Sequence, residues 1–505
     1  MNGTVSDRRT KILCTLGPSS SDIATIKEMM KAGMNAARLN FSHGDHEMHG
    51  KTIETIRRAA SELNIPFAIV QDLQGPKIRI GKLAKPFIIE EGEELIITTD
   101  KNVIPTGEDH EPRPRKVSTS YPLLAKDCRV GSHLMIDDGY LEVVVIEKNS
   151  EETELKCKVI TGGLLNQKKG INLAAASSEE EGEEASSISA PALTEKDIAD
   201  LEFGMKCGEI DYVCLSFVRS AQDIIDARQL MMKFSNHSKT VPIIAKIERI
   251  EAIRNIESII KECDGIMVAR GDLMIETRFD ELPILQKDLI ERSSKAGKVD
   301  ITATQMLQSM VDNKIPTRAE VTDVANSIFD GTDVTMLSNE TATGKHPVLA
   351  VKTMSTIVRT ADLNCDRFGR LSAHENEFDS LAVDSIDIAT CMAAAAIAKK
   401  HTSLKLVCCI THSGRSAFNI SQFRVSVPII ALTDQNGTYN RLSLGWGITP
   451  VLIKKPISEY LSSEELCAQY LKENGFAQSG DLIVMVLGAE TINHQAHTVR
   501  LVKLP

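Results

Sequence analysis

A strand followed by a helix recurs eight times along this chain, with one long interruption after the third strand. Short apolar runs alternate with segments whose apolar residues fall at helical spacing. The predicted strands are KILCTL (11–16), AARLNF (36–41), FAIVQDL (67–73), DYVCLSFV (211–218), VPIIAKIE (241–248), GIMVARGD (265–272), KVDITATQM (298–306) and DVTMLSNE (333–340). Eight strand–helix units are the number that closes a (β/α)8 barrel, so this rhythm predicts that fold.

Polar residues end nearly all of these runs. They are Thr15, Asn40, Asp72, Ser216, Glu248, Asp272, Thr304 and Ser338. The carboxyl ends of the strands form the active-site face of such a barrel, so we expect these side chains to meet there.

Two of the runs carry the densest charge. VPIIAKIE delivers Lys246 and Glu248, and GIMVARGDL delivers Arg270 and Asp272. Charges at the end of a buried strand are costly unless they pair, bind a metal or take part in chemistry. Two carboxylates at neighbouring strand ends predict a site for one divalent cation. Lys246 beside them is expected to neutralise charge that develops on a substrate.

The interruption, residues 77–190, has a different texture. Alternating segments such as FIIEEGEELIITT and HLMIDDGYLEVVVIE, separated by Gly, Asn and Asp, predict an inserted antiparallel β-barrel domain. Pro76 and Pro191 flank it, so we expect it to close over the catalytic barrel (1–76 and 191–364) as a lid on two hinges. The acidic SSEEEGEEASS loop (177–187) is interpreted as a solvated insertion.

A third region follows the eighth unit. KLVCCIT, VPIIALT and DLIVMVLGAE alternate with helical segments and predict an open α/β domain over residues 365–505. Its turn ITHSGRSAF (410–418) carries a glycine, two serines and an arginine between a strand and a helix. Such a turn is typical of a phosphate nest, although an ordinary strand–helix turn is the commoner explanation.

Composition and net charge indicate which classes of partner and which cellular compartment to expect. The net charge of the 505 residues is -11, which argues against nucleic acid as the main partner. The 11 cysteines are scattered without a CxxC pair, which predicts free thiols in a reducing compartment. The first residues lack a signal-peptide pattern, and no apolar stretch has the length of a membrane span. We therefore expect a cytoplasmic protein without a membrane partner.

The motif RLNFSHG (38–44) leaves two interpretations open. Arg38 is suited to clamp a phosphate, while Asn40 and Ser42 offer oxygen ligands. The alternative is that Ser42 caps a helix and His43 is a surface imidazole. In QDLQGPKIR (71–79), Lys77 and Arg79 place two cations at the hinge of the insert. The alternative is that this segment is only a solvated hinge without a ligand.

The motifs ARGDL and ATQM raise the same question. Gly271 and Asp272 stand at the start of a predicted helix, where free N–H groups attract a carboxylate or phosphate. Thr304 offers a hydroxyl to the same anion. The alternatives are that Asp272 is only an N-cap and that Thr304 is an interior strand residue.

Seven motifs carry a family resemblance when they are taken together. ARLNFSHG, QDLQGPKIR, IIAKIE, MVARGDL, ATQML, PTRAEVTDVAN and MLSNETA occur here in the order and spacing of the pyruvate kinases. The chain resembles that family over the whole barrel, and the insert and the C-terminal region fit the same architecture. The resemblance implies transfer of the phosphoryl group of phosphoenolpyruvate to ADP, giving pyruvate and ATP in glycolysis.

The resemblance also implies roles for individual residues. Glu248 and Asp272 would hold Mg²⁺ or Mn²⁺, Lys246 would stabilise the phosphoryl group in transfer, and Arg38 would grip it. Gly271 and Asp272, with Thr304, would bind the substrate carboxylate, and Thr304 and Ser338 would belong to the proton path. The nucleotide would meet a set consisting of Asn40, His43, Arg79, Asp138 and Lys169.

Departures from the family pattern concern the monovalent cation. Many members bind K⁺ through residues matching Asn40, Ser42, Asp72 and the position of Leu73. Those members usually carry Thr at the position of Leu73 and Glu at the position of Lys77. Two cations a few Å apart repel, so an ammonium there takes the place of the ion. The prediction is activity that needs Mg²⁺ and no K⁺.

Further departures are local. Met274 and Asn339 each replace a glycine of the family, and Asp300 lies in a strand that is normally apolar. The effector loop of regulated members matches a segment that contains Thr411, Ser413, Gly414, Arg415 and Ser416. His412 stands there in place of a frequent lysine, which argues against fructose 1,6-bisphosphate and leaves another sugar phosphate or a nucleotide as effector.

Two competing functions stay open at this point. One is a Mg²⁺-dependent barrel enzyme of pyruvate or phosphoenolpyruvate carbon chemistry, such as an aldolase. The other is an inactive relative that senses a ligand through its C-terminal domain. The lid with its basic pair favours phosphoryl transfer over the aldolase. The inactive relative is disfavoured by the presence of Lys246, Glu248, Asp272, Arg38 and Thr304. The family resemblance implies a homotetramer.

Overall fold

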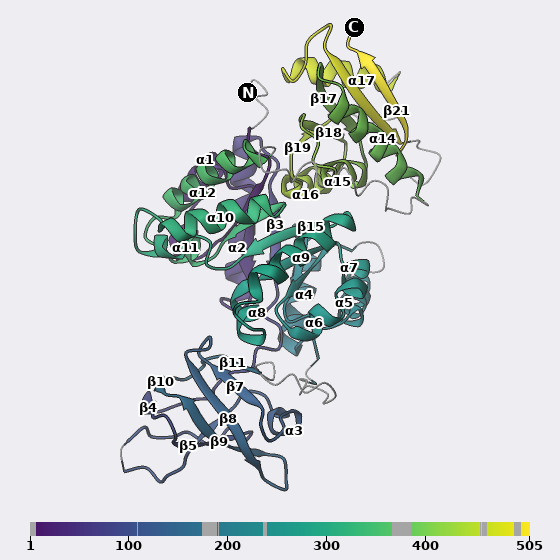
Figure 1. Cartoon of the computed structure of the whole chain (residues 1–505). Coiled ribbons are helices and arrows are strands. Elements are labelled where there is room, and N and C mark those ends of the chain that lie inside the picture. The colour runs from purple at the N-terminus through teal and green to yellow at the C-terminus, as the bar shows by residue number, and fades with distance from the viewer. Residues whose placement is uncertain are drawn as a thin grey trace.

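The eight predicted runs form a closed, all-parallel barrel (Figure 1). This computed structural model describes residues 7–108, 110–173, 189, 191–235, 240–365, 385–454, 456, 462–488 and 496–505. The barrel closes because the first strand pairs with both the second and the last. Its strands are β1 (Lys11–Thr15), β2 (Ala36–Asn40), β3 (Ala68–Asp72), β12 (Tyr212–Leu215), β13 (Ile243–Ile247), β14 (Gly265–Ala269), β15 (Val299–Ala303) and β16 (Val334–Leu337).

Helices pack around the outside of this barrel. They are α1 (Ile23–Ala32), α2 (His46–Leu63), α4 (Glu195–Cys207), α5 (Ala221–Phe234), α6 (Ile250–Arg254), α7 (Ile256–Glu262), α8 (Arg270–Glu276), α9 (Leu282–Lys295), α10 (Arg318–Phe329), α11 (Asn339–Ala342) and α12 (Pro347–Asp362), with short 3-10 turns η1 (Pro18–Ser20) and η2 (Gln308–Val311). Asp45 caps α2 by accepting from the Met48 N–H, so Ser42 is not the cap. The alternative interpretation of Ser42 is thereby removed.

The insert folds as sheets of its own between β3 and α4. Its elements are β4 (Phe87–Ile89), β5 (Glu94–Thr98), β6 (Arg115–Ser118), α3 (Leu124–Asp127), β7 (His133–Ile136), β8 (Leu141–Lys148), β9 (Glu154–Thr161), β10 (Gly163–Leu165) and β11 (Ile171–Leu173). A six-stranded sheet has the order β11-β7-β8-β9-β5-β6, and β10 pairs with β4. The pairs are antiparallel except β5 with β6, which run parallel because residues 99–114 carry the chain back to the start of its neighbour.

The end of the insert rests on the barrel. Strand β11 packs against α8. The helix that carries Asp272 therefore also supports the exit of the insert. The acidic loop 177–187 lies outside the described residues.

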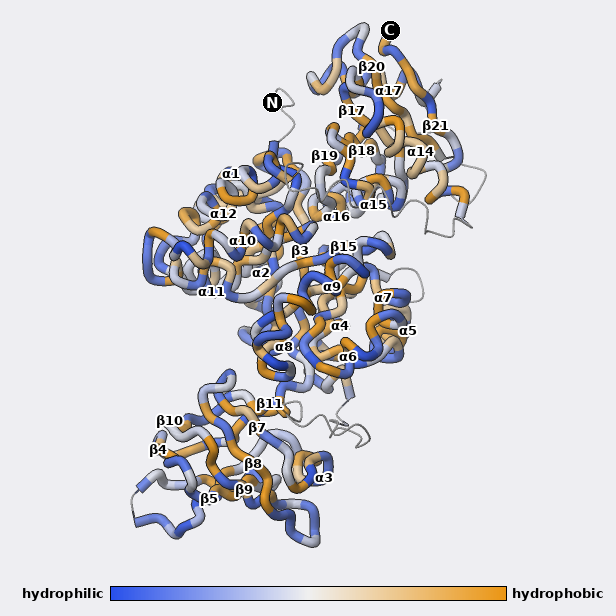
Figure 2. Tube along the Cα trace, viewed as in Figure 1, coloured by the Kyte–Doolittle hydropathy of each residue, from blue (hydrophilic) through white to orange (hydrophobic). Residues whose placement is uncertain are grey.

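The C-terminal region forms a five-stranded sheet of order β19-β18-β17-β20-β21. Its elements are α14 (Ile386–Lys400), β17 (Leu404–Ile410), α15 (Arg415–Gln422), β18 (Ile429–Thr433), α16 (Asn436–Arg441), η4 (Leu442–Leu444), β19 (Ile448–Leu452), α17 (Ser463–Glu473), β20 (Leu482–Gly488) and β21 (Ala496–Lys503). Figure 2 shows hydrophobic residues concentrated on these strands, as expected for a sheet covered by helices. The open α/β domain predicted from the sequence is confirmed.

The C-terminal domain closes the floor of the barrel, the end opposite to the polar strand ends. Leu444 is fully buried in one cluster with inward-facing barrel residues such as Leu13, Val70 and Met267. Figure 1 shows the barrel between the C-terminal domain and the insert.

All 11 cysteines are free thiols. No helix among the described residues has both the length and the apolarity needed to cross a membrane.

Candidate active site

Four charged side chains from three barrel strands meet at the mouth. Arg38 on β2 donates from Nε to Asp72 Oδ2 at 2.5 Å, and Asp72 ends β3. Lys246 on β13 places Nζ 2.9 Å from Glu248 Oε1 and 3.6 Å from Asp72 Oδ1. Asp72 and Glu248 are almost fully buried, so this alternation of charges is held away from bulk water.

The carboxylates keep Lys246 charged in spite of its burial. Burial alone would lower the pKa of Lys246, but Asp72 and Glu248 outweigh it and raise that pKa above its ordinary value. Burial likewise opposes ionisation of Asp72, yet Arg38 and Lys246 bring its pKa below the ordinary range. The mouth therefore presents a permanent ammonium and guanidinium to an anionic substrate.

A second carboxylate stands beside Glu248. Burial raises the pKa of Glu248, the charge of Lys246 opposes that rise, and the charge of Asp272 adds to it. Asp272 lies in the first turn of α8, and its Oδ1 is 3.1 Å from Lys77 Nζ. The helix N-cap is Ala269, so Asp272 is not the capping residue. Each of the two carboxylates therefore has an ammonium beside it, Lys246 for Glu248 and Lys77 for Asp272.

Thr304 follows β15 in an unusual backbone conformation. Its φ is 79°, a left-handed value that a β-branched residue rarely adopts. Arg270 holds this turn, because its guanidinium donates to the carbonyls of Ala303 and Thr304 at 3.2 and 2.7 Å. A Cβ on Gly271 would come within 2.8 Å of Thr304 Cγ2, so only glycine leaves this threonine its place. The strain indicates a functional turn.

The remaining strand ends are arranged by backbone contacts. The backbone N–H of Ser338, at the end of β16, donates to Glu340 Oε2 at 2.7 Å. The Glu340 Oε1 accepts from the Leu307 N–H at 3.0 Å, so one buried carboxylate joins the loops after β15 and β16. This contact fixes the segments that carry Thr304 and Ser338 relative to each other.

The positions matching a monovalent-cation site have their oxygens engaged elsewhere. Asn40 Oδ1 accepts from the Ser42 N–H at 3.1 Å, Asp72 pairs with Arg38, and the Leu73 carbonyl accepts from Ser216 Oγ at 2.7 Å. In the part of the chain that the structure describes, none of these positions bonds Lys77, whose ammonium lies on Asp272 instead.

The predicted nucleotide residues divide between barrel and insert. His43 is exposed just beyond β2, and Arg79 forms an isolated bridge with Gly170 in the insert. Lys169 pairs with Asp137 at 2.6 Å, next to the exposed Asp138. The sequence-predicted effector residues lie at the other end of the molecule, where Gly414, with a φ of 90°, begins α15.

Comparisons with known proteins give the family. The family described as "Pyruvate kinase, barrel domain" matches residues 7–351, and "Pyruvate kinase, alpha/beta domain" matches residues 388–502. The chain belongs to the pyruvate kinase family. A pyruvate kinase of Staphylococcus haemolyticus is 39% identical over 487 residues, which are 96% of this chain and 78% of that protein. Pyruvate kinase 2 of Synechocystis is 39% identical over 498 residues, 98% of this chain and 79% of its own length.

A solved structure agrees with the sequence relatives. The crystal structure of a pyruvate kinase from Cryptosporidium parvum superposes with a TM-score of 0.88 at 34% identity, covering 99% of this chain and 97% of that one. Membership makes the protein a phosphotransferase, and pyruvate kinases use phosphoenolpyruvate, ADP and Mg²⁺. The aldolase and inactive-relative alternatives are therefore set aside.

The candidate site at the barrel mouth fits a magnesium ion. Mg²⁺ is usually held by one or two carboxylates, with water and substrate oxygens completing its shell. Glu248 and Asp272 are such a pair, and among the described residues no group of three or more His, Cys, Asp or Glu gathers as a full protein cage. A site of two carboxylates leaves room for the oxygens of a substrate.

Three contributors to the candidate site were given no specific role by the sequence analysis. Arg270 holds the Thr304 turn, Ser216 accepts a hydrogen bond from Lys246 Nζ at 2.7 Å, and the Phe217 N–H donates to Glu248 Oε2 at 2.7 Å. Ser216 and Arg270 were visible as polar residues at strand ends. Phe217 acts through its backbone at a φ of 56°, for which the sequence offers no signal.

Proposed function

We propose that this pyruvate kinase transfers phosphoryl groups with Mg²⁺ and without K⁺, with Lys77 as its built-in cation. The observation that carries the proposal is the ammonium of Lys77, 3.1 Å from the carboxylate of Asp272. Family members that need K⁺ carry a glutamate at this position, which would bring a negative charge to the same place. An ammonium fixed to the chain supplies positive charge without an ion.

Arg38 and Lys246 are proposed to hold the phosphoryl group. Both are charged, both face the mouth, and their carboxylate partners fix their direction. Phosphoryl transfer is mainly positioning and neutralisation of charge on the equatorial oxygens, which suits two oriented cations in a site with little water. Mg²⁺ held by Glu248 and Asp272 would supply further neutralisation of substrate oxygens.

The substrate carboxylate is proposed to bind at the start of α8. The N–H groups of Gly271 and Asp272 and the hydroxyl of Thr304 are the donors, and the absence of a side chain at Gly271 lets the anion approach. We place Thr304 and Ser338 on the path by which a proton reaches the enolate carbon, because Glu340 ties their two segments together.

The insert is proposed to act as the lid over this site. We assign residues 77–190 to the lid, 1–76 and 191–364 to the catalytic barrel, and 365–505 to the C-terminal domain. Arg79, Lys169 and Asp138 would come to the nucleotide phosphates from the lid, while Asn40 and His43 stand on the barrel. The packing of β11 against α8 supports this role, because it joins the end of the lid to the helix of Asp272.

Initial rates with Mg²⁺, measured with and without K⁺, test the proposal. We expect less than about a twofold difference between K⁺-free buffer and buffer with saturating K⁺, because the ammonium of Lys77 already supplies positive charge beside Asp272. A tetramethylammonium salt keeps the ionic strength constant in the K⁺-free arm. Stimulation by an order of magnitude or more would reject the built-in cation but leave the kinase activity intact.

Replacing Arg270 by lysine tests the strained turn. We expect kcat/KM for phosphoenolpyruvate to fall about tenfold, because a lysine cannot hold two carbonyls in the way the guanidinium fork does and a small misplacement of Thr304 is costly. KM should account for most of the loss. The exposed Arg254→Lys change serves as control, and equal kcat/KM in both variants would remove Arg270 from the site.

Regulation and assembly are proposed from two surface features. Thr411 to Ser416 form a turn in which the Gly414 N–H is held by Thr411 Oγ1 at 2.9 Å, which supports binding of a sugar-phosphate or nucleotide effector. Phe279, Ile284 and Ile315 are 67 to 79% exposed around α8, α9 and α10, which supports a subunit interface and hence a homotetramer. Light scattering measures the mass of the assembly and so tests the homotetramer. The same measurement with sugar phosphates or AMP added tests whether an effector changes that assembly.

A further inference from the structure

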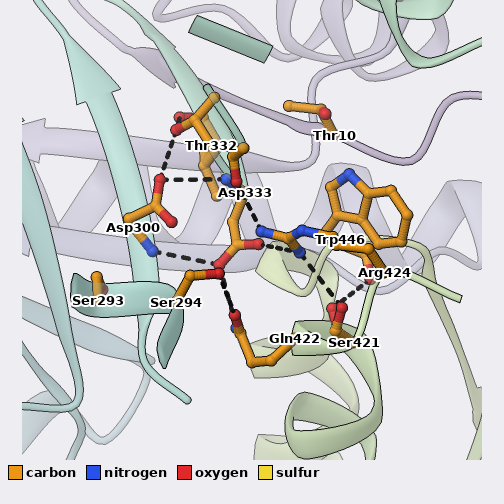
Figure 3. A network of polar contacts seen from close by, with 12 residues as sticks. Thr10, Ser293, Ser294, Asp300, Thr332, Asp333, Ser421, Gln422, Arg424 and Trp446 are labelled. Atoms are coloured by element: carbon orange, nitrogen blue, oxygen red, sulfur yellow. Dashed lines mark hydrogen bonds and ion pairs between the residues drawn. The ribbon is translucent and has the colours of Figure 1, made fainter. Parts of the chain in front are cut away.

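Two carboxylates are buried together on the floor of the barrel, where it meets the C-terminal domain (Figure 3). Asp300 lies in β15 and Asp333 directly precedes β16, and both are at most 1% exposed. Each side chain faces the backbone of the other residue. The Asp300 N–H donates to Asp333 Oδ2 at 3.3 Å, and the Asp333 N–H donates to Asp300 Oδ1 at 3.3 Å. The two carboxyl groups therefore share one dry site.

A single arginine of the C-terminal domain serves this site. Arg424 places NH1 2.7 Å from Asp333 Oδ1 and donates from NH2 to the Gly331 carbonyl at 2.7 Å. Its guanidinium lies over the ring of Trp446 at 4.8 Å, as Figure 3 shows. Gln422 adds an amide donor to Asp333 Oδ2 at 3.4 Å. Asp333 is thus the carboxylate that holds the C-terminal domain.

Asp300 has weaker partners. Its Oδ1 accepts from Thr332 Oγ1 at 2.6 Å, while its Oδ2 is buried and has no hydrogen-bond partner among the described residues. The pairing of Arg424 with Asp333 leaves Asp300 without a cation of its own. A buried carboxylate in that position is costly as an anion and far less costly as a neutral acid.

Three other ionisable side chains near the pair are engaged with carbonyls. Lys11 on β1 donates from Nζ to the Ile448 carbonyl at 2.8 Å, and the Tyr212 hydroxyl on β12 donates to the Arg441 carbonyl at 3.1 Å. Arg9 stacks over Trp446 at 5.3 Å and donates to the Ser426 carbonyl. Among the described residues, Arg424 is the one cation that pairs with either carboxylate, so two carboxylates stand against one guanidinium.

We propose that Asp300 and Asp333 share one proton at neutral pH, and that this proton sets how firmly the C-terminal domain is held on the barrel. With the proton on Asp300, Arg424 balances the single charge of Asp333. Loss of the proton to solvent leaves a second buried anion, and only an opened junction would solvate it. The strands that begin at this pair end at Thr304 and Ser338, so the junction is joined directly to the proposed catalytic end.

The direction of the pH effect follows from the same geometry. Burial, and next the charge of Asp333, raise the pKa of Asp300 well above its ordinary value. The closed junction then binds a proton that the opened or unfolded chain releases once the pH exceeds the ordinary value for aspartate, about 4. Stability of the junction is therefore complete below that pH and decreases as the pH rises, until the pKa of the folded form is passed.

Infrared spectroscopy of the full chain detects whether one of the two carboxyl groups is protonated. The carbonyl band of a protonated carboxylic acid should be weaker at neutral pH in Asp300→Asn than in the parent. It should also be weaker in Asp333→Asn, because Asp300 then ionises against Arg424. If the carbonyl band is as strong in Asp300→Asn or in Asp333→Asn as in the parent, the proposal of a shared proton is wrong. If Asp300→Asn does not fold, Asp300→Val removes the same acid from a β-strand.

The pH dependence of unfolding tests the effect on the junction. Between pH 6 and pH 9, the unfolding equilibrium constant of the parent should rise with pH more steeply than that of Asp300→Asn. The difference should be about tenfold per pH unit, which is the value expected when unfolding releases one proton. Amide exchange in residues 331–337 and 421–424 should show the same difference. Asp226→Asn, the same change on an exposed face of α5, should keep the slope of the parent. Parallel slopes for the parent and Asp300→Asn would reject the proposal.

Discussion

Replacing Lys246 by methionine is expected to lower kcat by about 10²–10³-fold while phosphoenolpyruvate still binds. Methionine keeps most of the length of the side chain and removes its ammonium group. That charge is held within 2.9 Å of Glu248, where it faces the position proposed for the transferred group. The loss should fall on kcat because the ammonium acts mainly on charge that develops in the transition state. A coupled assay of pyruvate formation measures it.

Stability has to be separated from catalysis in this variant. Removing Lys246 leaves Glu248 and Asp72 with less positive charge, and we expect protonation to relieve part of that cost. Circular dichroism checks folding, and calorimetry with Mg²⁺ and phosphoenolpyruvate checks binding. Lys298→Met is the matched control, because Lys298 donates to the Cys263 carbonyl on the floor, away from the mouth. A near-normal kcat in folded Lys246→Met would exclude this lysine from the mechanism.

The reversal of charge at Lys77 is the second large effect. In Lys77→Glu we expect the rate without K⁺ to fall about 10–100-fold and to recover in part when K⁺ is added. The glutamate would remove the ammonium 3.1 Å from Asp272 and introduce an anion that attracts a monovalent cation. Initial rates across a K⁺ titration at saturating Mg²⁺ measure both parts of the expectation.

A control in the same segment makes the result specific. Lys82→Glu introduces the same charge at an exposed position of the insert and should leave both the rate and the absence of K⁺ stimulation unchanged. If Lys77→Glu loses activity but K⁺ does not restore any of it, Lys77 matters for Mg²⁺ or substrate binding rather than as a substitute for the ion. Full activity of Lys77→Glu without K⁺ would contradict the idea altogether.

Much of the barrel could be predicted from local patterns. All eight strands lie inside the predicted runs, and the helix that carries Asp272 begins where the ARGDL motif indicates. Such patterns succeed because strand and helix periods are set by neighbouring residues. The insert was less predictable: the parallel pairing of β5 with β6 depends on the path of the long segment between them.

Contacts between distant segments account for what was missed. Ser42 and Asp45 are both plausible caps by residue type, and the geometry of the turn selects Asp45. Asp300 is only an odd residue in an apolar strand until Arg424 of another domain is placed beside Asp333. The turn at Thr304 depends on Arg270 and on the empty space at Gly271. None of these relations is encoded by spacing along the chain.

By itself, the amino-acid sequence determined which residues stand at the ends of the eight strands and that two carboxylates and a lysine are among them. Only the tertiary structure decided how these charges pair. Lys77 and Asp272 are 195 positions apart, and closure of the barrel and docking of the insert bring them to 3.1 Å. The physical reason is that backbone periodicity is local, whereas charges in a buried site are stabilised by whichever opposite charges the packing brings within a few Å.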